Sequence, residues 1–492
     1  MEKFYVACDF GVRTSRIMLG TLHNQTLTVN ELRRFKTPVN NEKKALQWHI
    51  PEIYRETVLA LSEVGAQEVN LAGVSCSSWG ADYMLFDRDD TLLTPVYHHA
   101  DPRTNDTLKT VLAKIPAEAI YDETGVQSRP ANTLFQLRAE SSRRLKRDHR
   151  LLPFADGFNH LLGGDRCVEM SLASTTQLFN PARRAWSSRL ISELGWPLEM
   201  LPPVVSPGAK LGRLRPDVAK QTGLEDVTVI ATCSNELSAA LAGLPLGHGK
   251  DWAYLRIGGE SLMGTEVPAP LISRLTRELG YSNESCLGGA TNFHKRTVGL
   301  WLFEECRRFW IGQDRELSDD VLLHLATTSP AFECLINLAD PRFATPGDMP
   351  LKIQAYCRET GQEIPRKPGQ IIRCVLESLA LEYRKAFQEL ELLTGSKFTR
   401  LYLFGAAENG LLNHFVVNAL QVPVILASPE AAAIGNVLVQ ALALRHIPSL
   451  GEAREILRNS IKTQAIIPHP TSWDTAATRM LELTATELTS AN

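Results

Sequence analysis

The chain alternates between short apolar runs that fit buried strands and stretches with apolar residues at helical spacing. Strands are predicted where an apolar run stops at a glycine or a polar turn. These runs cover residues 4–8, 16–22, 69–76, 227–232, 252–257, 400–404 and 422–427. Helices are predicted at residues 237–244, at 371–390 and from residue 430 through 436. Strands that alternate with helices indicate an α/β fold.

A strand-turn-strand pattern occurs near the start of each half of the chain. Residues 4–22 read as a hairpin around Asp9-Phe10-Gly11, and residues 252–264 read as a second one around Gly258-Gly259-Glu260. The second strands of the two hairpins have weakly similar sequences, IMLG in the first hairpin and SLMG in the second. The repeat favours two halves with a cleft between them. We therefore predict an N-terminal domain at 1–246 and a C-terminal domain at 247–492.

Composition narrows the classes of protein that fit this pattern. The 492 residues include 44% hydrophobic and 22% charged residues, and 52 Lys and Arg nearly balance 55 Asp and Glu. That balance argues against a dedicated nucleic-acid binder, and no apolar run approaches the ~18 residues of a membrane span. The nine cysteines form no Cys-x-x-Cys pair, so neither a zinc knuckle nor a disulfide framework is indicated. With no leader pattern at the start, we expect a cytoplasmic monomer or homodimer with a small-molecule ligand.

Small and polar residues follow three of the predicted strands, in the segments DFGVRTSR, SSWGAD and CSNELS. A tight turn between strands can aim backbone N–H groups and hydroxyls at phosphate, with arginine as a charged donor. Tryptophan beside glycine offers an apolar face that a sugar can approach closely. Taken alone, the first segment also fits an ordinary hairpin, Trp79 a core residue and Asp82 a turn residue.

The order of several longer segments carries a resemblance. SSWGADYMLFD, DPRTND, NTLFQLRA, ASTTQLFN, VGLWLFEECRR and VLESLALEY resemble segments of the FGGY carbohydrate kinases, and most of all the rhamnulokinases. That family has the actin-like, ribonuclease H-like fold, with a sugar-side and a nucleotide-side domain. The resemblance implies that the γ-phosphoryl group of ATP passes, with Mg²⁺, to the 1-hydroxyl of L-rhamnulose or a related ketose in the inter-domain cleft.

The resemblance also implies roles for individual residues. Asp9 would hold a Mg²⁺-bound water. The nucleotide and its phosphates would meet Asp9, Arg13, Thr14, Ser15, Arg16, Gly258, Gly259, Glu304, Gly405, Ala406 and Asn409. The sugar would meet Trp79, Gly80, Asp82, Asp101, Arg103, Asn132, Gln136, Ser234 and Arg296.

The chain departs from the family pattern at positions that touch the transferred group and the nucleotide. Asn235 stands where the family has its proton-accepting aspartate, and a carboxamide cannot take a proton at neutral pH. Glu236 is a possible substitute, but it lies one position along the chain and points elsewhere. Gly259 replaces a phosphate-binding threonine, and Glu260 adds a negative charge beside the expected phosphates.

Further departures affect the nucleotide and sugar segments. GAAEN replaces a glycine-rich adenosine motif, Arg296 and Glu304 replace an asparagine and a glutamine, and YHHAD replaces Tyr-Arg-Asp. These changes keep a second hypothesis open, a pseudokinase that binds sugar or nucleotide as a sensor or regulatory partner. A third is an ATPase of the same fold with another role, against which the sugar-side segments argue.

Overall fold

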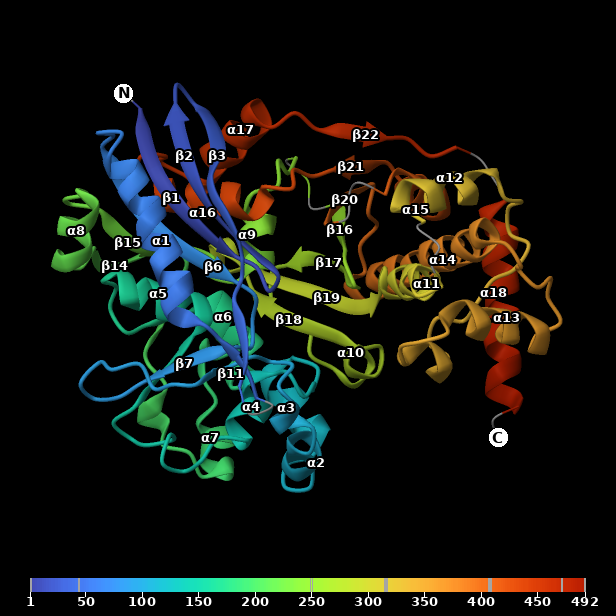
Figure 1. Ribbon diagram of the computed structural model, residues 1–492, viewed down its shortest axis with the longest axis horizontal. Helices are drawn as coiled ribbons and strands as arrows, with labels where there is room; N and C mark the ends of the chain where they lie inside the picture. Colours follow the sequence, from blue (N-terminus) through green and yellow to red (C-terminus); the bar gives the residue numbers. More distant parts are fainter. Residues whose placement is uncertain are drawn as a thin grey trace. The chain divides into compact units, whose positions relative to one another are not determined.

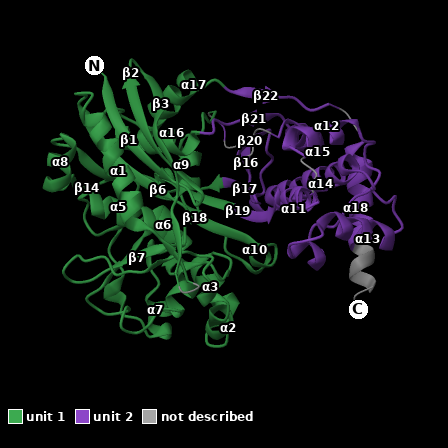
Figure 2. Ribbon diagram, viewed as in Figure 1, with its two compact units in different colours: residues 1–248, 266–293, 430–462 green, residues 249–265, 294–429, 463–492 purple. Residues whose placement is uncertain are grey.

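The computed structural model describes residues 2–42, 45–247, 249, 251–313, 317–405, 409–469 and 472–490, with side chains described up to residue 484. The chain forms two compact units (Figure 2). The first comprises residues 1–248, 266–293 and 430–462, and the second comprises 249–265, 294–429 and 463–492. The units are thus assembled from several segments each, whereas the predicted domains 1–246 and 247–492 are contiguous stretches. Those domain limits stay a prediction.

A six-stranded sheet organises the first unit, in the order β14-β15-β6-β1-β2-β3 (Figure 1). The strands are β1 (Lys3–Phe10), β2 (Thr14–His23), β3 (Thr26–Lys36), β6 (Leu71–Ser78), β14 (Ala209–Arg213) and β15 (Thr228–Ala231). β1, β6 and β15 run parallel, and β2, β3 and β14 extend the sheet in antiparallel fashion. The parallel strands therefore end at a common edge.

Helices cover both faces of this sheet. Successive residues of β1 point to opposite faces, and the residues on both faces are apolar and need to be buried. Val6, Cys8 and Phe10 belong to a core that includes residues of α1 (Ile50–Gly65) and α5 (Phe154–Leu162). Tyr5 and Ala7 belong to a second core, with residues of α16 (Ala431–Ala443) and α17 (Leu450–Ser460). All five of these β1 side chains are fully buried. A strand buried on both faces reads as a continuous apolar run, which is how this one was predicted.

Two helices of the first unit approach each other through glycine. α9 (Glu236–Ala242) lies against α16, and a Cβ atom on Gly435 would lie 1.9 Å from the Ala239 carbonyl oxygen. In the same way, a Cβ on Gly243 would lie 2.0 Å from the Ala431 carbonyl oxygen. The helices can pack this closely only because both positions lack a side chain. The contact fixes α9, whose first turn follows Asn235.

Parallel strands β16 (Trp252–Ile257), β20 (Arg400–Gly405) and β21 (Val424–Leu426) form the centre of the second unit's sheet. The order across this unit is β19-β17-β16-β20-β21-β22, with β17 (Glu260–Val267), β19 (Thr291–Val298) and β22 (Gln464–Ile466). β17 and β19 each continue along the chain into a segment of the first unit. The helices are α11 (Trp301–Ile311), α12 (Asp319–Thr328), α13 (Met349–Glu359), α14 (Pro368–Thr394), α15 (Gly410–Leu420) and α18 (Trp473–Ser490).

The elements predicted from apolar patterning are confirmed, with shifts at their ends. The strand expected at 69–76 is β6, which starts later and runs on to Ser78. The helix expected at 371–390 is the core of the 27-residue α14, and the alanine-rich helix is α16. The two predicted hairpins are β1–β2 and β16–β17. The α/β fold class is confirmed.

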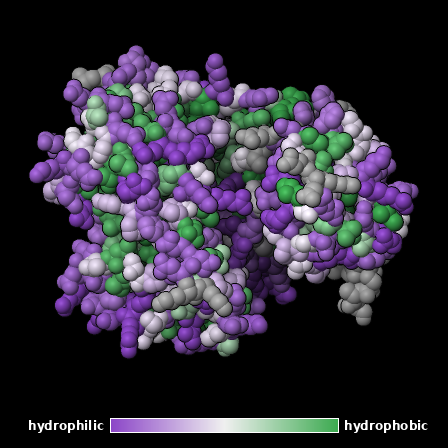
Figure 3. All heavy atoms as spheres, viewed as in Figure 1, coloured by the Kyte–Doolittle hydropathy of each residue, from purple (hydrophilic) through white to green (hydrophobic). Residues whose placement is uncertain are grey.

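Hydrophilic residues predominate on the face of the molecule seen in Figure 3, and hydrophobic residues form small scattered groups there. Such scattered apolar positions are normal on a protein surface. Within the described residues, the helices fall short of the length or the apolar character needed to cross a membrane.

The glycine contact between α9 and α16 yields a stability prediction. Gly435→Ala should lower the free energy of unfolding by about 1–3 kcal/mol, because the new Cβ meets a backbone oxygen that no side-chain motion can move. Urea unfolding at equilibrium measures the change.

Gly451→Ala on α17 is the matched control, since its Cβ would approach only Ser449 Oγ, at 3.8 Å. It should leave stability unchanged or raise it slightly through helix propensity. Equal effects of the two substitutions would contradict the close-contact explanation.

Candidate active site

The parallel strands of the first unit bring three predicted site segments to one sheet edge. Asp9 pairs with Ser77 in the β1–β6 register, and Ser78 forms a parallel bridge with Asn235 just after β15. Neighbouring strands lie about 4.8 Å apart, so the backbones of Asp9 and Asn235 are roughly 10 Å apart with β6 between them. Trp79 directly follows Ser78. The first phosphate turn, the sugar segment and the base position are therefore neighbours.

Asn235 caps helix α9. Its Oδ1 accepts hydrogen bonds from the backbone N–H groups of Leu237 at 2.9 Å and Ser238 at 3.2 Å, and its side chain is almost fully buried. Asparagine is among the preferred residues for this role. The cap leaves only the amide NH₂ to face a ligand, and an NH₂ group can donate but not accept. Glu236 begins the helix and is half-buried.

A buried carboxyl pair holds the turn before Asn235. Ser234 donates through Oγ to Asp156 at 2.9 Å and through its backbone N–H to Glu169 at 2.9 Å. The Ser171 hydroxyl donates to Glu169 and accepts from the Asn235 backbone N–H at 2.9 Å. Ser234, predicted to contact sugar, is fully buried, and its hydroxyl is used inside this network.

Both carboxyl groups of the pair resist ionisation. Burial, opposed in part by hydrogen bonds, raises the pKa of Asp156 to about 7. Burial, together with the nearby Asp156 charge, raises the pKa of Glu169 to about 8. A pair that is at least partly protonated at neutral pH can both accept and donate hydrogen bonds at the base of the turn.

Asp82 is the centre of a second buried network. Its Oδ2 accepts from Trp48 Nε1 at 2.8 Å, Trp79 Nε1 at 2.8 Å and His99 Nδ1 at 2.9 Å. Its Oδ1 accepts from Gln136 Nε2 at 2.9 Å. Burial opposes its ionisation, but His99 and the other donors outweigh burial, so the pKa of Asp82 is lowered. Two of the other predicted sugar residues, Trp79 and Gln136, thus donate to the third, Asp82.

Most of the remaining sugar-side residues also join local networks. Asp101 accepts from the Leu46 backbone N–H at 2.7 Å, and Arg103 donates to the Gln136 carbonyl oxygen at 2.9 Å. Asn132 donates to Gln177 Oε1 at 2.8 Å. Gly80 lies against Thr175, whose Oγ1 would be 2.7 Å from an added Cβ. The polar residues therefore stabilise the edge of the first unit's sheet, and Trp79 and Gly80 form part of its surface.

The predicted phosphate turn divides into buried and exposed groups. Arg13 and Thr14 are exposed, whereas Ser15 is fully buried with its hydroxyl 2.8 Å from Thr37 Oγ1. Asp9 is buried and forms an ion pair with Arg16, with 2.6 Å between Oδ2 and Nη2. A carboxylate beside a guanidinium suits a site that receives a hydrated cation together with phosphate oxygens.

The nucleotide-side candidates lie in the second unit. A Cβ on Gly259 would meet nothing within 4 Å, while one on Gly405, at φ +99°, would lie 2.0 Å from the Ile257 carbonyl oxygen. The Gly258 carbonyl oxygen accepts from the Leu300 N–H at 2.8 Å. Asn409 caps α15 through Leu412 N–H at 3.0 Å, and Glu304 lies in the first turn of α11. Ala406 lies outside the described residues.

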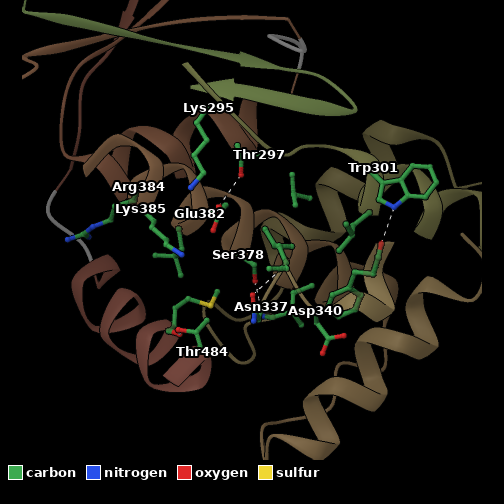
Figure 4. A pocket seen from close by; sticks show the side chains of 18 of the residues that line it. Lys295, Thr297, Trp301, Asn337, Asp340, Ser378, Glu382, Arg384, Lys385 and Thr484 are labelled. Atoms are coloured by element: carbon green, nitrogen blue, oxygen red, sulfur yellow. Dashed lines mark hydrogen bonds between the residues drawn. The ribbon is translucent and has the colours of Figure 1, made fainter. Parts of the chain in front are cut away.

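A cavity of about 790 Å³ opens beside the Gly258–Glu260 turn (Figure 4). Gly259 lines it, and so do the cations Lys295, Arg296, Arg384 and Lys385 and the acids Glu260, Asp340 and Glu382. Trp301, Leu302, Phe343 and Leu381 add apolar surface. Within the described residues its lining includes neither Glu304 nor Gly405 nor Asn409. Charged groups of both signs beside an apolar surface suit a polar ligand with an apolar part.

An α/β fold of two units, with polar strand ends at a sheet edge, defines a broad class that includes many nucleotide-dependent enzymes. The chain belongs to the FGGY family of carbohydrate kinases. The model of the family's N-terminal domain matches residues 4–243, and the model of its C-terminal domain matches residues 253–444. Its class is therefore that of a sugar kinase, a phosphotransferase acting on an alcohol group.

Curated relatives and solved structures agree with that assignment. The chain is 33% identical to the rhamnulokinase of Bacteroides thetaiotaomicron over 97% of this chain and 98% of the relative. It is also 33% identical to the rhamnulokinase of Enterococcus faecalis over 95% of each chain. The fold matches a gluconate kinase from Lactobacillus acidophilus with a TM-score of 0.79 at 16% identity, covering 100% of this chain and 98% of that one. A xylulose kinase from Rhodospirillum rubrum matches with a TM-score of 0.78 at 18% identity over 98% of both chains.

Three residues that sequence reasoning did not assign to the site prove central to its framework. His99 binds Asp82, and Asp156 and Glu169 hold the Ser234–Asn235 turn. Asp156 is the only acid in the largely apolar stretch PFADGFNHLL. That pattern could have marked it as a buried group with a fixed partner.

The His99–Asp82 pair predicts a pH-dependent stability. Burial lowers the pKa of His99, but the Asp82 charge and hydrogen bond outweigh burial and raise it overall. The stabilisation from His99 is then fully present below its unfolded pKa of about 6.5 and is lost as pH rises through the folded pKa. The difference in melting temperature between the native chain and His99→Gln should be larger at about pH 5.5 than at about pH 8.5.

His98→Gln provides a control of opposite sign. Burial and the neighbouring His99 lower the pKa of His98 to about 4. Its neutral form is therefore favoured in the folded chain, so the stability of the native chain relative to His98→Gln should rise between about pH 4 and the unfolded pKa of about 6.5 and stay level above it. The same trend in both variants would contradict the assignment of the charged histidine.

Proposed function

We propose that the chain phosphorylates the 1-hydroxyl of L-rhamnulose or a related ketose, with ATP as the phosphoryl donor and Mg²⁺ as the metal. The observation that carries this proposal is the similarity to rhamnulokinases along almost the whole chain. The sugar would be received at the first unit's sheet edge by Trp79, Gly80 and the amide of Asn235. The YHHAD segment, which contains His99, lacks the arginine of the family's Tyr-Arg-Asp pattern, so a ketose other than L-rhamnulose is an open choice.

ATP supplies the transferred group, and residues of both units are assigned to it. In the first unit, Arg13, Thr14 and Arg16 offer donors to phosphate oxygens, and Asp9 would hold Mg²⁺ through water. In the second unit, the open space around Gly259 lets a ligand reach the backbone. The cavity beside it offers Lys295, Arg384 and Lys385 to phosphate and an apolar surface to an aromatic base, and it also contains three acids. Ser15 is withdrawn from this proposal because its hydroxyl is buried against Thr37.

Asn235 determines how fast such a reaction can be. Phosphoryl transfer depends mainly on positioning and charge, so a kinase can work slowly without a base. The Asn235 NH₂ can orient the substrate hydroxyl oxygen by donating a hydrogen bond to it. That hydrogen bond occupies a lone pair of the oxygen, and the oxygen needs a free lone pair to attack the phosphorus. Loss of a general base typically lowers the rate about 10²–10⁴-fold.

The second candidate is a pseudokinase that binds sugar or nucleotide as a sensor or regulatory partner. It is favoured by Asn235 and by Glu260, which places a carboxylate beside the expected phosphates and lies 3.6 Å from Arg296. This candidate predicts that ligands raise the melting temperature without turnover.

Asn235→Asp separates the two candidates. A carboxylate keeps the cap on α9 and adds a proton acceptor, so sugar-dependent ADP release should rise about 10²–10⁴-fold. A coupled ADP assay with ATP, Mg²⁺ and L-rhamnulose, followed by a panel of ketoses, measures the gain.

Two control variants make the outcome specific. Asn235→Ala removes the cap without adding a base, so it should lose about 1 kcal/mol of stability and gain no activity. Glu236→Gln tests the substitute base, and a large loss of native turnover would assign the role to Glu236. Ligand-induced stabilisation without ADP release in the native chain and in Asn235→Asp would reject the kinase and support the sensor.

A further inference from the structure

Three cysteine side chains converge in the core of the second unit. Cys334 lies between α12 and α13, Cys357 is on α13 and Cys374 is on α14. Their sulfur atoms all lie within 4.8 Å of one another, and the residues are 3%, 0% and 2% exposed. Since they come from three separate segments, neither a single turn nor one helix face accounts for their meeting. In the described part of the chain, these are the only cysteines that form such a group.

The spacing of the sulfurs fits a metal ion at their centre. An ion equidistant from three sulfurs 4.8 Å apart would lie roughly 2.8 Å from each, about 0.5 Å beyond a normal zinc–sulfur bond. Because 4.8 Å is the upper limit of the separations, rotation of the side chains can close that difference. Ordinary core packing of three small side chains is the competing explanation, and it requires no ligand.

The surroundings of the group favour a soft cation and not a hard one. The group contains only sulfur ligands in the described residues, whereas Mg²⁺ and Ca²⁺ require oxygen. Thiolate ligands select ions such as Zn²⁺ and Cu⁺. Both ions have filled d shells and no ligand-field preference, so neither is excluded by a three-sulfur arrangement.

A fixed positive charge lies beside the group. Arg479 of α18 donates to the Phe332 carbonyl oxygen at 2.7 Å and to the Glu333 carbonyl oxygen at 3.1 Å, next to Cys334 in sequence. Its charge acts on Cys357. Glu377, a nearby acid, is paired with Arg373 at 2.7 Å. Three thiolates with Zn²⁺ carry a net charge of about −1, which Arg479 offsets.

We propose that Cys334, Cys357 and Cys374 bind one thiophilic cation with a filled d shell, Zn²⁺ or Cu⁺, as three thiolates. Each S–H proton leaves to solvent and is replaced by a sulfur–metal bond, so the binding involves no change of oxidation state.

The bound ion would brace a wall of the second unit's cavity. The chain that follows Cys334 supplies Ile336, Asn337 and Asp340 to the lining. The Ile336 N–H donates to Ser378 Oγ at 3.0 Å. Ser378 lines the cavity (Figure 4) and follows Cys374 by one helical turn on α14. A metal at Cys334 would tie this segment to α14 and α13, in addition to the Ile336–Ser378 hydrogen bond and the Arg342–Glu359 ion pair at 2.7 Å.

The test uses the full chain, reduced and stripped of metal, with Cd²⁺ as a spectroscopic probe. We expect one equivalent to bind, seen as a thiolate-to-cadmium charge-transfer band in the ultraviolet and as one added ion in native mass spectrometry. Parallel titrations with Zn²⁺ and Cu⁺ against chelators should show tight binding of at least one, and the tighter ion identifies the site's preference. Binding should also raise the melting temperature.

Cys334→Ser removes one ligand and should weaken binding by at least ~100-fold, since loss of mere outer-sphere support already costs about 10–100-fold. Cys306→Ser on α11, another buried cysteine of the same unit, is the matched control and should bind like the native chain.

Several results would overturn the proposal. These are an absence of Cd²⁺ binding, equal binding in Cys334→Ser, or failure of both Zn²⁺ and Cu⁺ to compete with the chelator. A thiol count below nine in the freshly purified, denatured and unreduced chain, with the loss mapped to these cysteines, would assign them to a disulfide and likewise reject the metal site.

Discussion

Buried polar groups must find partners within the protein, and this requirement decides which side chains at the first unit's sheet edge remain for a ligand. Asp82 receives hydrogen bonds from Trp48, Trp79, His99 and Gln136. A carboxylate with four donors is satisfied, and its removal would leave two indole N–H groups buried without an acceptor. The sugar-side acids therefore work chiefly as internal acceptors that fix aromatic rings in place, and the surface offered to a ligand is the one those rings and Gly80 create.

The same requirement links Asn235 to the carboxyl pair below it. The Asp156 charge already raises the cost of ionising Glu169, and Ser171 connects Glu169 to the Asn235 backbone. A third carboxylate at position 235 would add negative charge to this buried region, although two backbone N–H groups at the helix start would stabilise it. A neutral amide satisfies the cap without that charge. Asparagine in place of the family's aspartate at position 235 is thus favourable for the fold, even though it removes the group that accepts a proton.

The sequence predicts the framework well and the hydrogen-bond partners poorly, for a physical reason. A strand buried on both faces needs apolar residues throughout, so β1 and β6 can be predicted from apolar runs in the sequence. Their parallel register then places Asp9 near Asn235. Nothing local indicates that Asp82 accepts from His99, 17 residues later, or that Ser15 turns inward to Thr37. Such pairings depend on side-chain directions that only the assembled sheet fixes. The convergence of Cys334, Cys357 and Cys374 is hidden in the sequence for the same reason, since these residues lie far apart along the chain.

A glycine at a predicted ligand position supports ligand binding only if the backbone conformation and packing do not already require glycine there. Gly405 adopts a positive φ against the Ile257 carbonyl oxygen, so the fold demands glycine there whatever ligand is bound. Its presence is therefore no argument for nucleotide binding. Gly259 has open space around its Cβ position and no backbone strain, so the fold would accept a larger residue. Packing requires glycine at position 405 but not at position 259. The residues of the Gly259–Glu260 turn are therefore more informative than Gly405 about the proposed phosphate binding.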